Sequence, residues 1–462
     1  MALDLIVVLL YATGMIALGW YGMRRAKTRD DYLVAGRNLG PGFYLGTMAA
    51  TVLGGASTIG TVRLGYVHGI SGFWLCGAIG LGIVGLSLFL AKPLLKLKIY
   101  TVTQVLERRY NPAARHASAL IMLVYALMIG ATSTIAIGTV MQVLFGLPFW
   151  VSILVGGGVV VLYSTIGGMW SLTLTDIVQF LIMTIGLVFL LMPMSIVDAG
   201  GWDAMVAKLP ASYFDFTAIG WDTILTYFLI YFFGIFIGQD IWQRVFTARS
   251  EGVAKVAGTA AGLYCVLYGL AGALIGMAAK VLLPDLANVN NAFASVVQTS
   301  LPNGIRGLVV AAALAALMST AAAGLLAAST TVVQDLLPRL RQGREGGSGD
   351  VHENRIATLL MGALVLVIAL VVSDVISALT LAYNLLVGGM LIPLIGAIYW
   401  KRATTAGAIS SMSLGFLTAL FFMVKDGLDA NTPIYYSLSV ALVSFVVVSL
   451  LSPRANAVAK MV

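Results

Sequence analysis

Two hydroxyl residues, Ser319 and Thr320, lie in the middle of an alanine-rich apolar segment. If this segment is helical, Ala316, Ser319 and Thr320 have the spacing i, i+3, i+4, which places them on one face. Hard cations prefer several oxygen ligands, and the two hydroxyls with the Ala316 carbonyl would supply three. In a glycine-rich stretch nearer the N-terminus, the carbonyls of Ala50 and Leu53 are one helical turn apart and could supply the rest. Neutral oxygens without a carboxylate suit a Na⁺ ion that must also be released.

The same hydroxyls also have a purely structural interpretation, because Ser and Thr in membrane helices commonly donate to their own i−4 carbonyl. Other chemistry has less support in the sequence. Cys76 and Cys265 both fall in apolar segments, which predicts neither a disulfide framework nor a cysteine metal site. The three His residues form no ligand cluster, and a membrane enzyme would need clustered His, Asp or Glu. We therefore expect a protein that is not an enzyme.

A second polar set is made of hydroxyl and amide side chains inside the apolar segments. It suits a compact polar solute such as an amino acid, a short carboxylate or an amide-like compound. Its members, our candidate solute-binding residues, are Thr51, Ser57, Thr58, Thr132, Ser133 and Gln239.

Charged residues at membrane depth are functional by default, and we state an expectation for three of them. Arg63 is near the outer end of its segment, where it could snorkel or attract anionic solutes. Asp240 is one turn from Arg244, and we expect the two to pair. Asp176 is near the cytoplasmic end of its segment, where it could cap a helix, contact Lys or Arg, or attract an ion that leaves the protein.

The composition decides which elements must position these residues. Of the 462 residues, 60% are hydrophobic and only 10% are charged, with a mean hydropathy of +0.97. Soluble domains usually carry about a quarter charged residues. Because backbone groups must satisfy one another in lipid, spans are helices or barrel strands, and the long continuous apolar runs favour helices. The prediction is an all-α integral membrane protein in a lipid bilayer.

The runs indicate about thirteen membrane-spanning helices by the criterion of about twenty apolar residues. Their approximate limits are 2–23, 43–67, 72–97, 117–144, 149–166, 171–196, 221–244, 254–283, 305–335, 355–375, 380–399, 404–424 and 433–452.

Basic residues predict the orientation of these spans. If residues 24–40 are cytoplasmic, all but five of the 27 Lys and Arg residues fall on or towards the cytoplasmic side, as the positive-inside bias requires. The N-terminus is then outside and the C-terminus cytoplasmic, in the plasma or inner membrane. The net charge of +8 follows from this topology. No basic soluble face exists that would favour nucleic-acid binding, and residues 1–23 lack the basic start of a cleaved signal.

The second and seventh spans are both rich in glycine and polar residues, and they lie five helices apart. An odd number of spans per block inverts the second block, which is the plan in which paired broken helices build a site at the membrane midplane. Glycine-rich spans also serve close helix packing. We expect one transporter domain, divided into an extra N-terminal helix 2–23, repeat one 43–196, repeat two 221–399, two C-terminal helices within 404–452, and a cytoplasmic linker 338–354.

Four motifs, in order along almost the whole chain, resemble the sodium:solute symporter family. They are YLVAGRNLGP (32–41) with GYVHGISG (65–72), YSTIGGMWSLTLTDIVQ (163–179), WQRVFTARS (242–250) and AALMSTAAAGLLAASTTVVQDL (315–336).

The resemblance implies a leucine-transporter type of fold with Na⁺ as the coupling ion. Matched motif to motif, the sodium ligands would be Ala50, Leu53, Ala316, Ser319 and Thr320, the set that spacing had proposed. Some family members hold a second sodium with further Ser residues and the Asp of the TD motif. Here those Ser positions are Ala322 and Ala323, while Asp176 remains. We therefore expect one sodium per cycle, with Asp176 in ion release or coupling.

The expected function is sodium-coupled symport of a small polar solute into the cell by alternating access, by a protein that functions as a monomer. Sugar-transporting members carry polar residues at positions that are Val52 and Cys76 here, so a sugar is disfavoured. Choline would need an aromatic cage, and Trp is absent from the corresponding positions. The alternative is a membrane-embedded solute sensor on the same fold, which would normally add a signalling domain.

Overall fold

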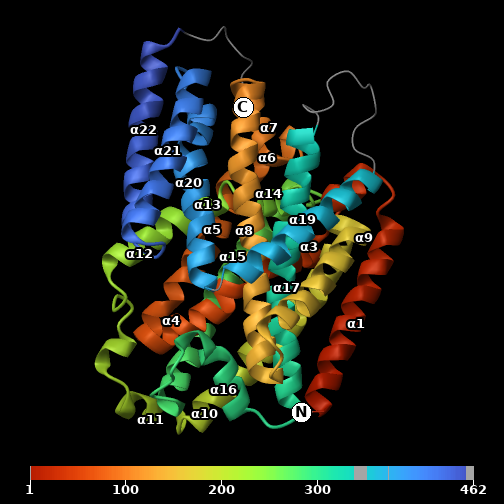
Figure 1. The fold of residues 1–462 in the computed structure, drawn as a ribbon, viewed down its shortest axis with the longest axis vertical. Coiled ribbons are helices and arrows are strands. Elements are labelled where there is room, and N and C mark those ends of the chain that lie inside the picture. Colours follow the sequence, from red (N-terminus) through yellow and green to blue (C-terminus); the bar gives the residue numbers. More distant parts are fainter. Residues whose placement is uncertain (1, 338–350, 373, 454–462) are drawn as a thin grey trace.

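The computed structural model describes residues 2–337, 351–372 and 374–453, and within them it is helical throughout, without a strand. The α-helices are α1 (Ala2–Arg25), α2 (Arg29–Val34), α3 (Pro41–Val52), α4 (Thr61–His68), α5 (Trp74–Gly85), α6 (Ala91–Leu97), α7 (Thr103–Arg109), α8 (Pro112–Phe145), α9 (Phe149–Met183), α10 (Met192–Asp198), α11 (Gly201–Lys208), α12 (Trp221–Tyr227), α13 (Phe233–Ile235), α14 (Gln239–Val245), α15 (Glu251–Leu282), α16 (Ala292–Ser300), α17 (Ile305–Thr331), α19 (Val351–Val371), α20 (Val375–Tyr399), α21 (Thr405–Asp426) and α22 (Thr432–Leu451). Figure 1 shows the long helices side by side, with the N-terminus at the opposite end from the end of α22.

Ten helical runs in the described residues are long and apolar enough to cross a membrane, and α12–α13 with α14 form an eleventh, bent by 49°. The expected number of thirteen is not confirmed by this count. Two of the ten runs are 42 and 50 residues long, about twice the length that one crossing needs. Each of them contains a reversal of the chain.

The longer run turns back inside α9, where Gly168 takes φ 54° and ψ −138°. The hydroxyl of Tyr163 donates to the carbonyl of Met318 in α17, and the hydroxyl of Tyr11 to the Met318 sulfur. Gln179 donates in turn to Tyr11. In a straight helix the sixteen residues from Tyr163 to Gln179 would span about 24 Å. Tyr163 bonds to Met318 directly and Gln179 is linked to it through Tyr11, which is possible because the helix reverses at Gly168.

The shorter run turns back at the 3₁₀ turn between α4 and α5. Gly258 of α15 lies against both Tyr44 of α3 and Ser87, which follows α5, whereas Gly276 lies against Val62 of α4. The chain therefore runs along α15 in one direction from Tyr44 to Val62 and returns by Ser87. As in α9, one uninterrupted apolar run contains two antiparallel segments.

Local signals place the helix ends as the sequence suggests. The Asn111 side chain accepts a hydrogen bond from Ala114 N at 2.9 Å and starts α8, with Pro112 at its first position. Gly146, with φ 67°, ends the helix in the left-handed conformation. The expected linker 338–354 lies mostly outside the described residues, and its last residues begin α19.

The centre of the molecule is α17, whose residues from Val309 to Thr331 are all buried. It packs on α8, α9, α1 and α19. Its alanines and glycines let neighbouring backbones approach closely; Gly324, for example, lies against the backbone of Ala126 and Gly130 in α8. Any site on α17 is thus enclosed by protein.

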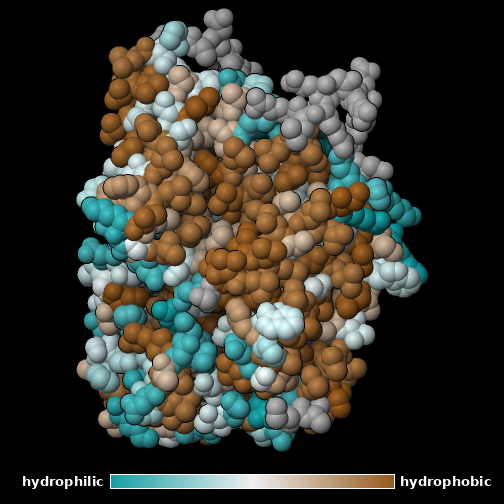
Figure 2. All heavy atoms as spheres, in the orientation of Figure 1, coloured by the Kyte–Doolittle hydropathy of each residue, from teal (hydrophilic) through white to brown (hydrophobic). Residues whose placement is uncertain are grey.

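The outside is apolar instead. Leu10 of α1 and Val424 of α21 are 69% and 88% exposed. Figure 2 shows hydrophobic side chains over most of the middle of the visible face, with hydrophilic ones mainly near its ends and edges. Because water would oppose so large an apolar area, this surface fits a lipid bilayer.

Both helices that were expected to break do so. The second span consists of α3 and α4 with a break after Val52 and a π-helical turn at Ala56–Gly60. The seventh consists of α12–α13 and α14, separated at residues 236–238. The bounds of the two repeats stay a prediction.

Candidate functional site

The break after α3 leaves carbonyls that no helical N–H can reach. Leu53 takes φ −87° and ψ 46°, outside the helical region. The Val52 carbonyl accepts a hydrogen bond from Ser57 Oγ at 2.6 Å, and the Leu53 carbonyl accepts one from Thr58 Oγ1 at 2.9 Å. Carbonyls at a helix end need such partners, and here hydroxyls of the following turn provide two of them.

The preceding carbonyls are met by α17. Ser319 Oγ lies 2.6 Å from the Ala50 oxygen and 2.9 Å from the Ala316 oxygen. Thr320 Oγ1 lies 2.7 Å from the Thr51 oxygen and 3.4 Å from the Ala50 oxygen. All five residues are buried. The hydroxyls thus reach across to α3 and do not serve their own helix alone.

This donor set fits a sodium ion. Two hydroxyl oxygens and the carbonyls of Ala50 and Ala316 form one cluster, and every oxygen in it is neutral. A cation at the cluster would replace the hydroxyl protons that now bridge the oxygens, so its binding needs small local rotations. The Leu53 carbonyl, one turn past Ala50, bonds to Thr58 and would complete the expected set after that bond opens. Thr51 enters the cluster through its carbonyl, which the sequence pattern did not indicate.

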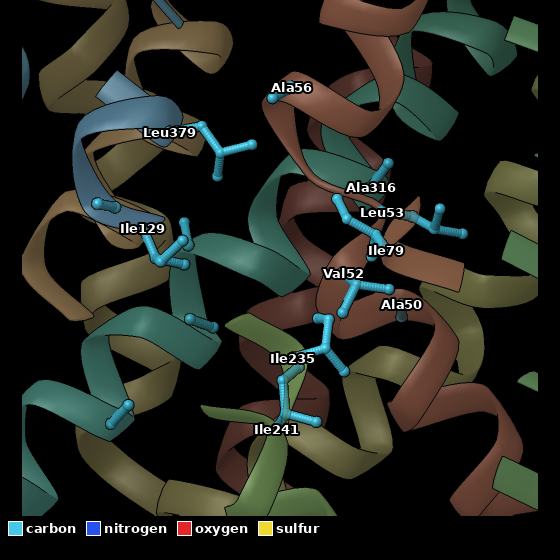
Figure 3. Packing of buried hydrophobic residues seen from close by; sticks show 14 of the residues in the cluster. Ala50, Val52, Leu53, Ala56, Ile79, Ile129, Ile235, Ile241, Ala316 and Leu379 are labelled. Carbon is cyan, nitrogen blue, oxygen red and sulfur yellow. The ribbon is translucent and has the colours of Figure 1, made fainter. Parts of the chain in front are cut away.

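A small cavity of about 20 Å³ adjoins the cluster, so a solute larger than a water molecule needs the cavity walls to move apart. It is lined by Thr51, Val52, Gly54, Gly55, Ala56, Ser57, Ile79, Ile129, Thr132, Ser133, Asp240, Thr320, Leu379 and Tyr383. Thr320 belongs to both the cluster and the cavity wall, so an ion and a solute would be close neighbours. Figure 3 shows Ile129 and Leu379 across from Val52 and Ile79 beside the break.

Gly54 makes this arrangement possible. A Cβ atom at this position would lie 2.5 Å from Thr320 Oγ1 and 2.6 Å from Ser133 Oγ, closer than real contacts allow. The absent side chain is what lets the broken helix lie between α17 and α8.

Four of the six candidate solute-binding residues line the cavity, namely Thr51, Ser57, Thr132 and Ser133. The other two are elsewhere. Thr58 contacts Tyr268 Oη at 3.0 Å and lines a second, smaller cavity of about 10 Å³. Gln239 accepts from Val102 N at 2.9 Å and donates to the Tyr100 oxygen at 2.8 Å. Its amide is therefore satisfied by the loop before α7.

The sequence pattern missed residues of α5, α8 and α20 on the cavity wall. Ile79, Ile129 and Leu379 give no signal, because they are ordinary apolar residues of apolar helices. Tyr383 could have been found, since a phenol within a span needs a polar partner or a cavity.

Asp240 also lines the cavity, and its expected pairing with Arg244 is wrong. The structure gives Asp240 no ion pair among the described residues; its Oδ1 accepts a hydrogen bond from Tyr125 Oη at 3.0 Å. Arg244 instead contacts Asp176, with Nη2 3.5 Å from Oδ2. A spacing of one helical turn made a contact between Asp240 and Arg244 possible. Arg244 contacts the Asp176 carboxylate of α9 instead.

The Asp176–Arg244 pair joins two of the sequence motifs at the centre of the protein. Both side chains are fully buried. Asp176 also accepts a hydrogen bond from Thr47 of α3, one turn before Thr51. Beside Arg244, Gln243 donates to Thr330 Oγ1 at 2.8 Å. Of the roles expected for Asp176, the structure shows one, the contact with an arginine.

Three further ion pairs lie towards the ends of the molecule. Arg115 bonds to Asp335 at 2.9 Å and to Glu107 at 2.6 Å, which ties the end of α17 to α7 and α8. At the other end, Arg63 bonds to Asp374, the N-cap of α20, at 3.2 Å. Burial raises the pKa of Asp374, but the Ser377 backbone N–H and Arg63 outweigh it, so this pKa lies below its ordinary value.

Comparison with known proteins places this site in context. The family model described as "Sodium:solute symporter family" matches residues 32–415. The chain is 29% identical to the sodium/pantothenate symporter of Escherichia coli (strain K12), over 97% of this chain and 96% of the relative. It is 24% identical to the osmoregulated proline transporter OpuE of Bacillus subtilis (strain 168), over 98% and 96%.

Solved structures show the same fold. A Na⁺-coupled sialic acid symporter in a substrate-bound, outward-open state superimposes with a TM-score of 0.86, at 22% identity and with 98% of each chain covered. A nucleobase-cation-symport-1 family transporter matches with a TM-score of 0.57 at 16% identity, over 93% of this chain and 97% of the other.

Proposed function

The chain belongs to the sodium:solute symporter family, and on this premise we propose that Ala50, Leu53, Ala316, Ser319 and Thr320 bind its coupling sodium ion. The protein is a sodium-coupled symporter that takes up a small solute, and it is not an enzyme. One observation carries the assignment: two buried hydroxyls of α17 bond to the carbonyls at the broken end of α3.

The solute site of the proposal is the adjoining cavity, with Thr51, Ser57, Thr132 and Ser133 among its binding residues. A sodium ion that bridges α3 and α17 would hold the break in the shape that forms the cavity wall at Thr320. The coupling is reciprocal: if sodium raises the affinity for solute, solute raises the affinity for sodium by the same factor. Alternating access then releases both inward.

The proposed solute is compact, an amino acid, short carboxylate or similar compound, and a sugar is disfavoured. Ile79, Ile129 and Leu379 make part of the cavity wall apolar, which leaves fewer groups for a polyol to bond. The named substrates of the relatives, pantothenate and proline, are consistent with this range.

One sodium per cycle is the proposed stoichiometry. Asp176, the acid of the TD motif, has its charge balanced by Arg244, and the neighbouring positions Ala322 and Ala323 offer no side-chain oxygen. In the proposal, Asp176 acts on the ion only as it leaves towards the cytoplasm.

The proposed topology has the N-terminus outside and the C-terminus in the cytoplasm, in the inner or plasma membrane. Helix α7, whose last turn carries Arg108 and Arg109, lies towards the end of the molecule opposite the N-terminus (Figure 1), and the basic end faces the cytoplasm under the positive-inside bias. The monomer is the proposed functional unit, because one chain supplies every residue of the ion site and the cavity.

The test is the double variant Ser319→Ala/Thr320→Ala. Each hydroxyl contact to a charged group contributes about 1.5–3 kcal/mol, so the loss of two ligands should weaken sodium binding by about 100-fold or more. Sodium titrations of the melting temperature measure this without a known solute, and proteoliposome uptake of labelled proline and pantothenate measures coupling.

The matched control is Thr331→Ala, which removes a buried hydroxyl of the same helix that bonds only to its own turn at Ala327, 2.9 Å away. It should leave the sodium response as in the wild type. An unchanged sodium response in the double variant would refute the assignment.

A further inference from the structure

A single carboxylate faces the solute cavity. Of the residues that line it, Asp240 is the charged one, and no Lys or Arg appears among the lining residues in the part of the chain that the structure describes. Asp240 is 2% exposed. An ionised carboxylate buried without a cationic partner is strongly unfavourable, so a cation bound beside Asp240 would stabilise its ionised form.

The protein itself directs its nearest arginine elsewhere. Arg244 is committed to Asp176 at 3.5 Å, and the salt bridges of the described residues include none to Asp240 within 4.0 Å. Tyr125 donates to Oδ1 of Asp240 at 3.0 Å, which orients the carboxylate without neutralising it.

The hydroxyls of the cavity wall add acceptors and few donors. Thr51 Oγ1 donates to the Thr47 carbonyl at 2.6 Å, Ser57 Oγ to the Val52 carbonyl at 2.6 Å, and Thr132 Oγ1 to the Met128 carbonyl at 2.8 Å. Each of these three hydroxyls has thereby used its proton, and only their lone pairs remain for a ligand. Ser133 Oγ accepts from Gly55 N at 3.3 Å and can still donate. A ligand that brings several N–H donors fits such a wall.

Aromatic rings complete the surroundings of Asp240. Tyr383 lines the cavity, and its ring packs edge-on against those of Tyr125 and Tyr231, at centroid distances of 5.3 and 5.2 Å. An aromatic ring near a carboxylate is a favourable setting for an organic cation, because its π face attracts positive charge.

We propose that the transported solute carries a protonated amine and that Asp240, held by Tyr125, binds this ammonium group. The proposal rests on the cavity's being the solute site. It narrows the solute to amino acids and other amines, and it excludes short carboxylates that lack an amine. Asp240 and the sodium cluster then have different roles. The cluster holds the coupling ion with neutral oxygens, and Asp240 holds the charged end of the solute.

The experiment compares probes that differ only in the amine. Purified protein in sodium is titrated with 4-aminobutyrate against butyrate, β-alanine against propionate, and ethanolamine against ethanol, with thermal stabilisation as the readout. In the wild type, the amine of at least one pair should bind about tenfold or more tightly than its partner, since a charge-assisted hydrogen bond is lost in the partner. Asp240→Asn, which keeps the acceptor for Tyr125, should abolish that preference.

Two further variants separate the charge from other effects. Asp335→Asn removes a buried carboxylate outside the cavity and should keep the amine preference. Tyr125→Phe keeps the Asp240 charge but removes the hydrogen bond that orients it, so the amine preference should fall below that of the wild type without being lost. If the Asn variant does not fold, an unchanged amine preference in Tyr125→Phe overturns the proposal.

Each other outcome overturns the proposal. Butyrate or propionate binding as tightly as its amine would do so, as would the absence of binding by every amine probe at millimolar concentration, or a preference that survives in Asp240→Asn. Loss of the solute-free sodium response in Asp240→Asn would instead make Asp240 an ion ligand. Failure of the sodium site itself is recognised separately, by a normal sodium response in Ser319→Ala/Thr320→Ala.

Discussion

Two polar clusters lie between α3 and its neighbours in the protein interior. Both satisfy buried polar groups, one with neutral oxygens and the other with full charges. At Ser319 and Thr320, neutral hydroxyls meet neutral carbonyls of α3. At Asp176 and Arg244, two full charges meet, both 0% exposed. Thr47 and Thr51, one turn apart on α3, belong to one cluster each.

The difference indicates what each cluster can do. Neutral oxygens attract a monovalent cation enough to bind it but not enough to prevent release. A charged pair in the interior is satisfied only by its partner, and removing one partner leaves an uncompensated charge. The first cluster is suited to an ion that enters and leaves, and the second to a permanent arrangement in which the arginine takes the place of a mobile cation.

The largest effect is expected when the charged cluster is broken. Arg244→Met should destabilise the protein by about 3–5 kcal/mol, because Asp176 is left buried and unpaired. Asp176→Asn/Arg244→Met should recover part of that loss. Thermal unfolding of the purified single and double variants measures both values.

The control for this cycle is Arg63→Met, which breaks a pair whose side chains are 26% and 31% exposed. It should cost about 1 kcal/mol or less. If Arg244→Met costs no more than Arg63→Met, the two clusters do not differ in the way described.

A smaller effect is expected at the neutral cluster. Gly54→Ala places a Cβ 2.5 Å from Thr320 and 2.6 Å from Ser133, and such overpacking costs about 1–3 kcal/mol. Sodium affinity should fall by about 10-fold or more, because the two helices must separate. Sodium titration by melting temperature is the measurement. Gly158→Ala, where a Cβ would meet nothing within 4 Å, should leave the titration unchanged; an equal loss in both variants would contradict the explanation.

The smallest effect is expected at Thr47, which bonds to the charged cluster. Thr47→Val removes the hydrogen bond to Asp176 and should cost about 1–2 kcal/mol of stability. Its effect on sodium affinity should be smaller than that of Gly54→Ala, since its side chain is not part of the neutral cluster. A loss of sodium affinity as large as that of Gly54→Ala would show that the two clusters act as one unit.

Much of the fold could be predicted from local patterns. Apolar runs predicted membrane helices, and glycine with polar residues predicted the breaks near Leu53 and Gly238. The reversal within α9 was also expected, since spans were predicted on both sides of it, at 149–166 and 171–196. The pattern did not predict that the helix continues on both sides of Gly168. The number of spans therefore depends on whether a helix that reverses direction is counted once or twice.

The candidate site divides in the same way. Ser319, Thr320 and Ala316 could be proposed because they repeat along one helix, and Ala50 because it is near a break. Asp240 was assigned to Arg244 because spacing shows only neighbours in the same helix. Gln239 was assigned to the cavity because a pattern does not reveal which way an amide points in a broken segment.

The sequence by itself determined that the protein is surrounded by lipid, where its helices and their breaks lie, and which kinds of ligand group are available to hold an ion. These follow from composition and short-range spacing, which act along one chain segment. Only the tertiary structure decided which partner each polar group has: Ser319 with Ala50, Arg244 with Asp176, and Asp240 with the cavity. The physical reason is that burial penalises a polar group without a partner, and helices far apart in sequence compete to supply one.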